Sequence, residues 1–239
     1  GDPVYDTLYF PPGTYRTDAL TVTGGVHLYL APGAVLLFTG EGGYVPGCEG
    51  NLIFKGVQGM DDTTTWCENA GIDGYGTVDG DSAGNRHLII WKGRNIEVRN
   101  TLFVNGVNWL GHVIGSDQVV FDNYMGMTNG RDALNIDCSR NVRMKDLFLA
   151  SSDDAHCLKV LRTKHNGLPT PREVPEIHNI TMRESLIFQE GYKAPNIGNE
   201  WFGSRIEKVL YEEIDIIRVA DSLHINNGED ADNGLTVAD

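Results

Sequence analysis

Three aspartates form the densest group of side chains that could do chemistry together in this 239-residue sequence. Asp153 and Asp154 are adjacent, and Asp132 precedes Asp153 by 21 residues. If this separation is one turn of a repeating structure, the three carboxylates meet in space and repel one another. Repulsion raises some of their pKa values and not others. One protonated acid beside ionised bases is what glycoside hydrolysis requires. A Ca²⁺ site and a solvated acidic corner are the alternatives for the same residues.

A repeated segment gives the reason to expect such stacking. Each copy begins with a polar residue, usually Asn, and continues with alternating apolar residues. The copies begin at Asn95, Gln118, Asn141 and Asn179, with a weaker copy at Lys208. The first three copies are 23 residues apart. Short β-type segments at a fixed period, without the apolar spacing of a helix, predict a solenoid whose coils bury their inward side chains against one another.

The parallel β-helix is the solenoid that fits best. The 29 glycines suit tight corners, and Asn at a fixed corner tolerates the left-handed conformation and can bond to the next coil. We therefore predict an all-β, single-domain chain over residues 1–239, with about ten coils stacked about 4.8 Å apart. The acidic stretch 227–239 is expected to be a poorly ordered tail or the point at which the domain is truncated.

The composition of the chain counts against several classes of function. The chain has 19 Lys and Arg against 33 Asp and Glu, a net charge of -14. It has no basic cluster, so a nucleic-acid partner is not expected. No apolar stretch approaches the ~18 residues that would indicate a membrane span, and no signal-peptide pattern is visible at the N-terminus. Metal-binding spacing is absent among Cys48, Cys67, Cys138 and Cys157, so no zinc site is expected, and their even number permits disulfides.

Several motifs follow one another in a specific order. The chain opens with Phe10-Pro-Pro-Gly-Thr-Tyr-Arg-Thr17, and Asp153 begins the block Asp153-Asp-Ala-His-Cys-Leu-Lys-Val160. Further motifs stand at residues 28–36, 74–80, 88–91, 95–98, 109–112 and 130–135. Together they resemble the motifs of the polygalacturonase-like glycoside hydrolases of family 28, well over residues 8–160 and weakly beyond.

The resemblance implies a right-handed, single-stranded parallel β-helix. It also implies inverting hydrolysis of an α-linked polysaccharide or oligosaccharide, of the pectin type or related to it. Asp153 would be the general acid, and Asp132 and Asp154 would position and activate the water. Activated water is sufficient for this chemistry, so no cofactor and no metal are expected. The resemblance further implies a secreted or periplasmic protein.

Nine further residues are candidates for binding the substrate. His112 lies about one coil before Asp132, His156 shares a face with Asp154 by two-residue alternation, and Lys159 matches a lysine of the family. Aromatic rings can stack on the C–H faces of sugars. The full set is His112, His156, Lys159, Arg131, Trp109, Tyr192, Lys193, Trp201 and His224.

The sequence departs from the family at three places. Asn135 stands where the family has a second Asp, which is not one of the three catalytic carboxylates. Residues 191–198 lack the His of the family. Residues 223–226 lack the Arg and Lys that hold a substrate carboxylate in polygalacturonases. A subsite without these cations is neutral or weakly charged, which counts against galacturonan as the substrate.

Two other functions stay open. A Ca²⁺-dependent polysaccharide lyase would need a basic residue to take the proton next to a carboxylate, and no basic pair is stacked at one-coil spacing. A non-catalytic carbohydrate-binding β-helix would bind without releasing product. The retained aspartates count against that function, whereas the missing His, Arg and Lys count for it. Nothing in the sequence indicates an oligomeric state.

Overall fold

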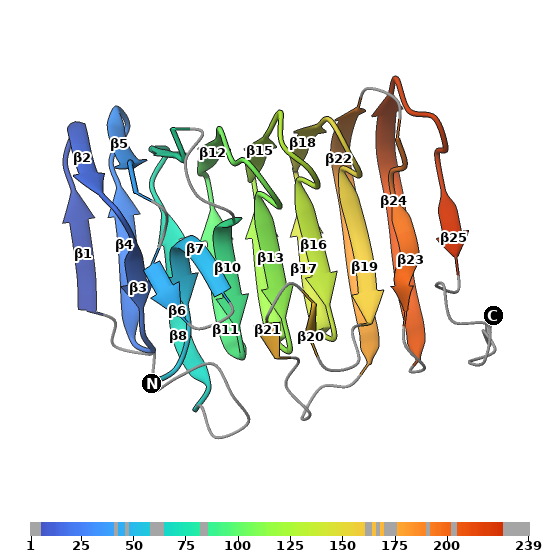
Figure 1. Cartoon of the computed structure of the whole chain (residues 1–239), viewed down its shortest axis with the longest axis horizontal. Helices are drawn as coiled ribbons and strands as arrows, with labels where there is room; N and C mark the ends of the chain where they lie inside the picture. The colour runs from blue at the N-terminus through green and yellow to red at the C-terminus, as the bar shows by residue number, and fades with distance from the viewer. Residues whose placement is uncertain are drawn as a thin grey trace.

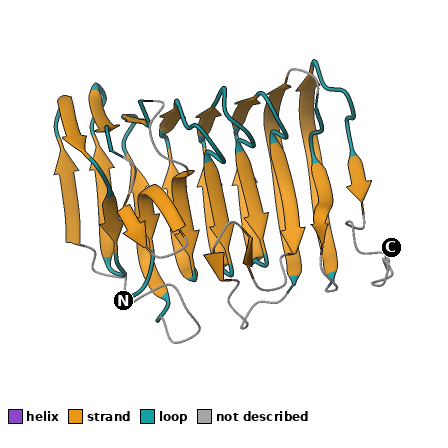
Figure 2. Ribbon diagram, in the orientation of Figure 1, coloured by secondary structure: helices purple, strands orange, loops and turns teal. Residues whose placement is uncertain are grey.

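The computed structural model describes residues 6–40, 43–45, 48–57, 65–81, 86–160, 164–165, 168–169, 176–189, 192–201 and 205–226. Within these ranges every regular element is a β-strand. A search of the same residues for a helix able to cross a membrane finds none. The strands stand side by side in a row that follows the chain from its blue N-terminal end to its red C-terminal end (Figure 1). Turns join them at both edges of the row (Figure 2).

Most strands belong to three parallel stacks, and each of the first six coils contributes one strand to every stack. The first stack contains β1 (Asp6–Phe10), β4 (Val26–Leu30), β8 (Cys67–Asp73), β11 (Gly93–Arg99), β14 (Asp117–Asp122), β17 (Arg140–Lys145), β22 (Ile177–Gln189) and β24 (Ile206–Ile217). The second contains β2 (Gly13–Thr17), β5 (Ala34–Phe38), β9 (Thr77–Asp79), β12 (Leu102–Val104), β15 (Met125–Met127) and β18 (Phe148–Ser151). β22 pairs with both β17 and β18, so it joins the first two stacks into one sheet.

The third stack, called here the third sheet, is separate. It contains β3 (Leu20–Val22), β7 (Cys48–Phe54), β10 (Arg86–Trp91), β13 (Gly111–Ile114), β16 (Leu134–Asp137), β19 (His156–Val160), β23 (Asn196–Trp201) and β25 (His224–Asn226). Two antiparallel additions complete the described strands: β6 (Gly43–Val45) pairs with β7, and β20 (Lys164–His165) pairs with β21 (Leu168–Pro169).

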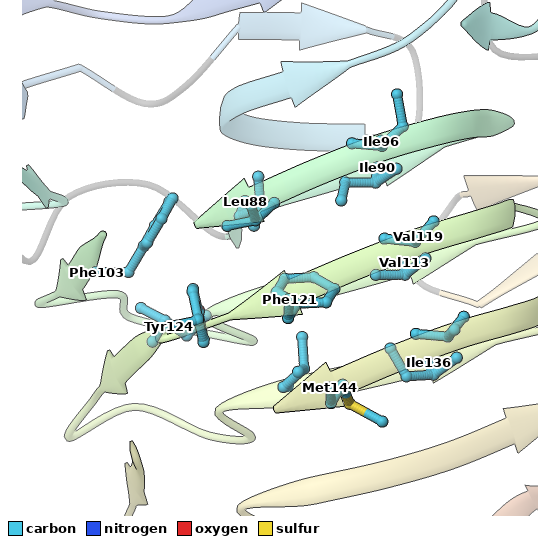
Figure 3. Close-up of a cluster of buried hydrophobic side chains, with 14 of the residues drawn as sticks. Leu88, Ile90, Ile96, Phe103, Val113, Val119, Phe121, Tyr124, Ile136 and Met144 are labelled. Carbon is cyan, nitrogen blue, oxygen red and sulfur yellow. The ribbon is translucent and has the colours of Figure 1, made fainter. Parts of the chain in front are cut away.

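The core fills the space inside the coils. Ile90, Val113, Ile136 and Leu158 are register partners in successive strands of the third sheet, and all four are fully buried. Ile96 and Val119 of the first stack belong to the same buried cluster as Ile90 and Val113 (Figure 3). Each coil therefore buries its apolar side chains against the coil before and the coil after, which is how a solenoid obtains a continuous core.

The corner before each repeat has the left-handed conformation that the sequence predicts. The five corner residues that the repeat predicts have φ between 54° and 57°: Asn95, Gln118, Asn141, Asn179 and Lys208. Asn95 Nδ2 donates to Asn69 Oδ1 at 2.7 Å, and Asn179 Nδ2 donates to Asn141 Oδ1 at 2.7 Å. At the coil that begins with Gln118 the ladder shifts by one residue, because Asn141 Nδ2 donates to Asp117 Oδ1 instead.

The predicted fold class is confirmed, because the described residues form a parallel β-helix. The predicted number of coils is not: eight strands stack in the third sheet, so the described residues make eight coils rather than about ten. A step of 23 residues holds in the middle of the chain, for example between Asn100 and Asn123, whose side-chain amides are hydrogen-bonded. The step is longer between the register partners His27 and Gly71, because this coil carries an insertion.

The remaining expectations about the chain fall partly outside the described residues. Residues 227–239, the expected acidic tail, lie outside them. The side chain of Cys48 is also not described. Cys67, Cys138 and Cys157 are buried thiols, so the disulfides that an even cysteine count permits are not formed by these three.

Candidate functional site

The turns that precede the strands of the third sheet position the aspartates. Asp132 and Asp154 each stand two residues before a strand, β16 and β19, and the first residues of these strands, Leu134 and His156, are register partners. The backbone N–H of Ala133 donates to the Asp154 carbonyl at 3.2 Å, which extends the pairing back into the turns. The two aspartates therefore occupy the same position in successive coils, as their spacing in the sequence predicts.

Asp132 is a buried carboxylate with a buried cation beside it. Its Oδ2 lies 3.0 Å from Lys159 Nζ, and both side chains are at most 5% exposed. Lys159 Nζ also lies 4.0 Å from the centre of the Trp109 ring. Burial raises the pKa of Asp132, and the Lys159 ammonium opposes this rise. The tryptophan and the carboxylate together fix where the ammonium lies.

Asp154 is held by donors from the next coil. Asn196 Nδ2 donates to Asp154 Oδ2 at 2.6 Å, and the backbone N–H of Lys193 donates to Asp154 Oδ1 at 3.1 Å. Asn196 is on β23 and is fully buried. Both oxygens of this carboxylate thus have a donor, which orients it toward the neighbouring coil.

Cys157 brings a thiol to the two carboxylates. Its Sγ lies 3.5 Å from Asp154 Oδ2 and 3.8 Å from Asp132 Oδ2. One ligand atom from each of the three residues lies within 4.8 Å of the other two, and all three side chains are buried. This arrangement, called here the carboxylate–thiol cluster, consists of Asp132, Asp154 and Cys157.

Asp153 differs from its neighbours because it is only half-buried. Its Oδ1 accepts a hydrogen bond from the backbone N–H of Asp154 at 3.0 Å, and its carbonyl accepts from Ser151 Oγ at 2.8 Å and from Gln189 Nε2. Burial, followed by the nearby Asp132 carboxylate, raises the pKa of Asp153. The turn therefore presents Asp153 as the most accessible of the three aspartates.

A row of polar side chains runs along the third sheet at the same register as Cys157. It passes through His112, Asn135, Cys157, Asn196 and His224, each a register partner of the next. His112 Nε2 lies 3.6 Å from Asp137 Oδ2, and both side chains are at most 1% exposed. This row places further polar side chains, most of them buried, on either side of the carboxylate–thiol cluster.

Most predicted site residues come together at this place. Asp132, Asp154, Lys159 and the backbone of Lys193 are in contact, and His112 packs edge-on against Trp109 with ring centres 4.9 Å apart. Other candidates lie further out: Arg131 and Tyr192 are exposed, and His224 lies two coils beyond Cys157. The side chain of Trp201 lies outside the described residues.

The structure places two of the predicted site residues in buried positions that the sequence did not predict. His156 does not share the face of Asp154: its ring is fully buried inside the coil, where Nδ1 lies 3.1 Å from the Leu134 carbonyl and the ring packs on Tyr211. Trp109 is 2% exposed and its ring is covered by Lys159 and Arg86, so it cannot stack on a sugar. Its ring instead holds the Lys159 ammonium through a cation–π contact.

The sequence reasoning missed Cys157 and Asn196 as parts of the site. A signal for Cys157 was present, because it lies two residues before Lys159 on the same strand and so points to the same face. Asn196 is the register partner of Cys157, but an insertion separates the two in the sequence, so the repeat period could not find it.

Comparison with solved structures finds the same fold in two exopolygalacturonases. The family 28 exopolygalacturonase of Yersinia enterocolitica has a TM-score of 0.74 at 16% sequence identity, over 91% of this chain. A hyperthermoactive exopolygalacturonase from Thermotoga maritima has a TM-score of 0.74 at 14% identity, over 92% of this chain. The fold is therefore that of the family 28 pectinases.

The same comparison limits what the fold implies. The chain spans 49% of the Yersinia structure and 60% of the Thermotoga structure. PfbA, a surface adhesin of Streptococcus pneumoniae, is also similar, with a TM-score of 0.53 at 13% identity over 94% of this chain and 74% of the adhesin. No protein-family model and no curated protein matches the sequence. At these identities the likeness is one of fold.

Proposed function

We propose that this chain is an inverting glycoside hydrolase that acts on an α-linked polysaccharide or oligosaccharide, of the pectin type or related to it. One observation carries the proposal: Asp132 and Asp154 stand at the same position in successive coils, with the more accessible Asp153 beside them. Inversion needs one general acid and one general base that activates a water, and these three aspartates can supply both. The fold shared with exopolygalacturonases supports this choice.

In the proposed mechanism one carboxyl group is the general acid and the other two activate the water. Asp153 donates its proton to the glycosidic oxygen as the bond from that oxygen to the anomeric carbon breaks. Asp132 and Asp154 hold a water on the opposite face of the sugar and take its proton as its oxygen bonds to the same carbon. One water is consumed, and the configuration at the anomeric carbon inverts.

The neighbours of the carboxylates have positioning roles in this proposal. Lys159 keeps Asp132 in place by its ion pair, and Asn196 with the Lys193 backbone N–H keeps Asp154 in place. Because the Lys159 ammonium is committed to Asp132, it is not the group that would bind a substrate carboxylate. With neither Arg nor Lys in residues 223–226, we propose a neutral or weakly charged sugar at that subsite. Action on an extracellular glycan would require a secreted or periplasmic protein.

The test is the release of reducing ends from homogalacturonan, rhamnogalacturonan, dextran and algal galactans. Wild type should release them from one of these substrates. Asp153→Asn should lower that rate by about 10²–10⁴-fold, since it removes the general acid and keeps the shape of the side chain. Asp146→Asn is the matched control: Asp146 lies in an exposed corner at φ 54°, where Asn is well tolerated, so its rate should equal that of wild type.

Two results would argue for another function. An unsaturated, ultraviolet-absorbing product that disappears with a chelator would indicate a lyase. Retained polysaccharide binding without product, in protein whose fold is verified by circular dichroism, would favour a carbohydrate-binding module. The observation that favours the binding module is the burial of the two base candidates, since Asp132 is 3% and Asp154 6% exposed.

A further inference from the structure

We propose that the carboxylate–thiol cluster, Asp132, Asp154 and Cys157, binds a thiophilic divalent cation such as Zn²⁺, and that the bound cation inhibits hydrolysis. The metal site follows from the geometry of the three side chains. Its inhibitory effect rests on the proposed function, because the same two aspartates would activate the water.

The two sulfur–oxygen distances in the cluster are close to those of a tetrahedral zinc site. Bonds of about 2.3 Å to sulfur and about 2.1 Å to oxygen, at a tetrahedral angle, separate a sulfur and an oxygen ligand by about 3.6 Å. Cys157 Sγ lies 3.5 Å from Asp154 Oδ2 and 3.8 Å from Asp132 Oδ2. Both sulfur–oxygen separations therefore match the tetrahedral value, and the two carboxylate oxygens lie within 4.8 Å of each other.

The ligand types select the metal. Ca²⁺ and Mg²⁺ take oxygen ligands, whereas a thiolate favours Zn²⁺ and the later transition metals. Cysteine spacing does not reveal this site, because only one ligand is a cysteine and the others come from two different turns. The fourth position of a tetrahedron remains for a water.

A second observation, from two side chains that adjoin the cluster, supports a polar ligand at this place. Asn135 and Asn196 are fully buried next to the cluster. The Oδ1 atoms of both side chains have no hydrogen-bond partner within the described part of the chain. Buried polar atoms without a partner are costly, so a metal-bound water that donates to them would lower the free energy of the site.

The charges also balance when a divalent cation binds. Two carboxylates and a thiolate carry three negative charges, and the Lys159 ammonium carries one positive charge. A divalent cation brings the sum over these four groups to zero. On binding, Cys157 releases its thiol proton to water, and the metal takes the Asp132 Oδ2 that Lys159 contacts at 3.0 Å. The Lys159 ammonium then keeps its cation–π contact with the Trp109 ring, whose centre lies 4.0 Å from Nζ.

The test measures metal binding without any substrate, so it fails or succeeds independently of the hydrolase proposal. Chelator-treated wild-type protein is titrated with Co²⁺, which should give a near-ultraviolet charge-transfer band from thiolate to cobalt, saturating at one equivalent. Zn²⁺ should displace it. Cys157→Ala and the isosteric Cys157→Ser should both lack the band and bind Zn²⁺ more than about 100-fold more weakly, since even outer-shell changes cost up to that factor.

Cys67→Ala is the matched control, because Cys67 is buried in the apolar core and its Sγ donates to the Val22 carbonyl. It should keep the band. Circular dichroism verifies that each variant is folded. A wild-type protein without the band, or a band that survives in both Cys157 variants, would overturn the metal site. Zn²⁺ inhibition, expressed relative to each variant's own metal-free rate, should weaken in parallel with binding. A wild-type rate that Zn²⁺ leaves unchanged would refute the inhibitory role alone.

Discussion

His87 is buried in a neutral form that its hydrogen bonds require. Asn51 Nδ2 donates to His87 Nδ1 at 3.1 Å, so Nδ1 accepts and Nε2 donates to the Val78 carbonyl at 3.0 Å. Burial lowers the pKa of His87 to about 4, and it does the same for His156. Because neither ring is solvated, protonating either of them in the folded protein costs free energy as the pH falls.

The folded protein should therefore lose stability between pH 7 and pH 5. In the unfolded chain a His has a pKa near 6.5 and binds a proton over this range, whereas the folded rings do so only near pH 4. The unfolded state is stabilised, by about 2 kcal/mol per His at pH 5. Urea titrations at the two pH values measure this loss. Because His87→Gln removes one of the two groups, it should reduce the loss by about 2 kcal/mol. An equal loss in the variant would contradict the explanation.

The position of single side chains on a strand was the hardest feature to predict. The alternation rule was counted from Asp154, which lies in a turn, and it therefore assigned His156 to the outer face. Alternation begins only where the strand begins, at His156 itself. The inner face then receives His156 and Leu158, and the outer face receives Cys157 and Lys159. The two-residue alternation of side chains does not continue through a turn of unknown geometry. Spacing counted across the turn therefore could not distinguish the two faces of the strand.

At the scale of elements, the corner residues make a testable contribution to stability. Asn141 has φ 54°, accepts from Asn179 and donates to Asp117. Asn141→Ala loses both hydrogen bonds and places an alanine in the left-handed region, at a cost of about 2–4 kcal/mol. Asn141→Gly loses only the bonds, and should be about 1 kcal/mol more stable than the alanine variant. Chemical denaturation of both variants checks this, and a more stable alanine variant would exclude a conformational role for the corner.

The corners and the parallel stacks were predictable because their signals are local and repeated. Polar residues at Asn95, Gln118 and Asn141 mark the same corner at a constant interval, and the strand that follows each is read from its alternation. The insertions were not predictable in this way. Between Asn141 and Asn179, which are hydrogen-bonded corners, the step is 38 residues, and nothing in the period says which residues leave the coil. For this reason the repeat period could not predict the number of coils or the position of Asn196.

At the scale of the whole molecule, the site depends on which coils are neighbours. Inserting a copy of residues 93–115 between Cys138 and Ser139 adds one complete coil between Asp132 and Asp154. Gly93, Ser116 and Ser139 stand at equivalent positions, each bonded to the next at a separation of 23 residues. The strands should therefore still pair, and circular dichroism should be unchanged. The two aspartates would move to about 9.6 Å apart, twice the strand spacing, and reducing-end release should fall to the level of Asp153→Asn.

The same segment inserted after Gly115 forms the matched control. This coil precedes Asp132 and leaves it next to Asp154. Activity and Co²⁺ binding should therefore survive in the control and vanish in the first insertion variant. Equal activity in both would mean that the one-coil separation of the aspartates is not needed.

The uniform step between coils also determines how the chain can fold. Across the central strands each residue pairs with its equivalent in the next coil, such as Ile96 with Val119 and Val119 with Val142, which is a short distance along the chain. Proteins whose strands pair over long distances fold slowly, because a large loop must close before any contact is gained. Here each coil pairs with the coil before it by closing only a short loop. Folding can therefore propagate from coil to coil, as it would in a helical repeat protein. The two longest steps in the first stack, which end at Gly71 and Asn179, are the places where that spreading should slow.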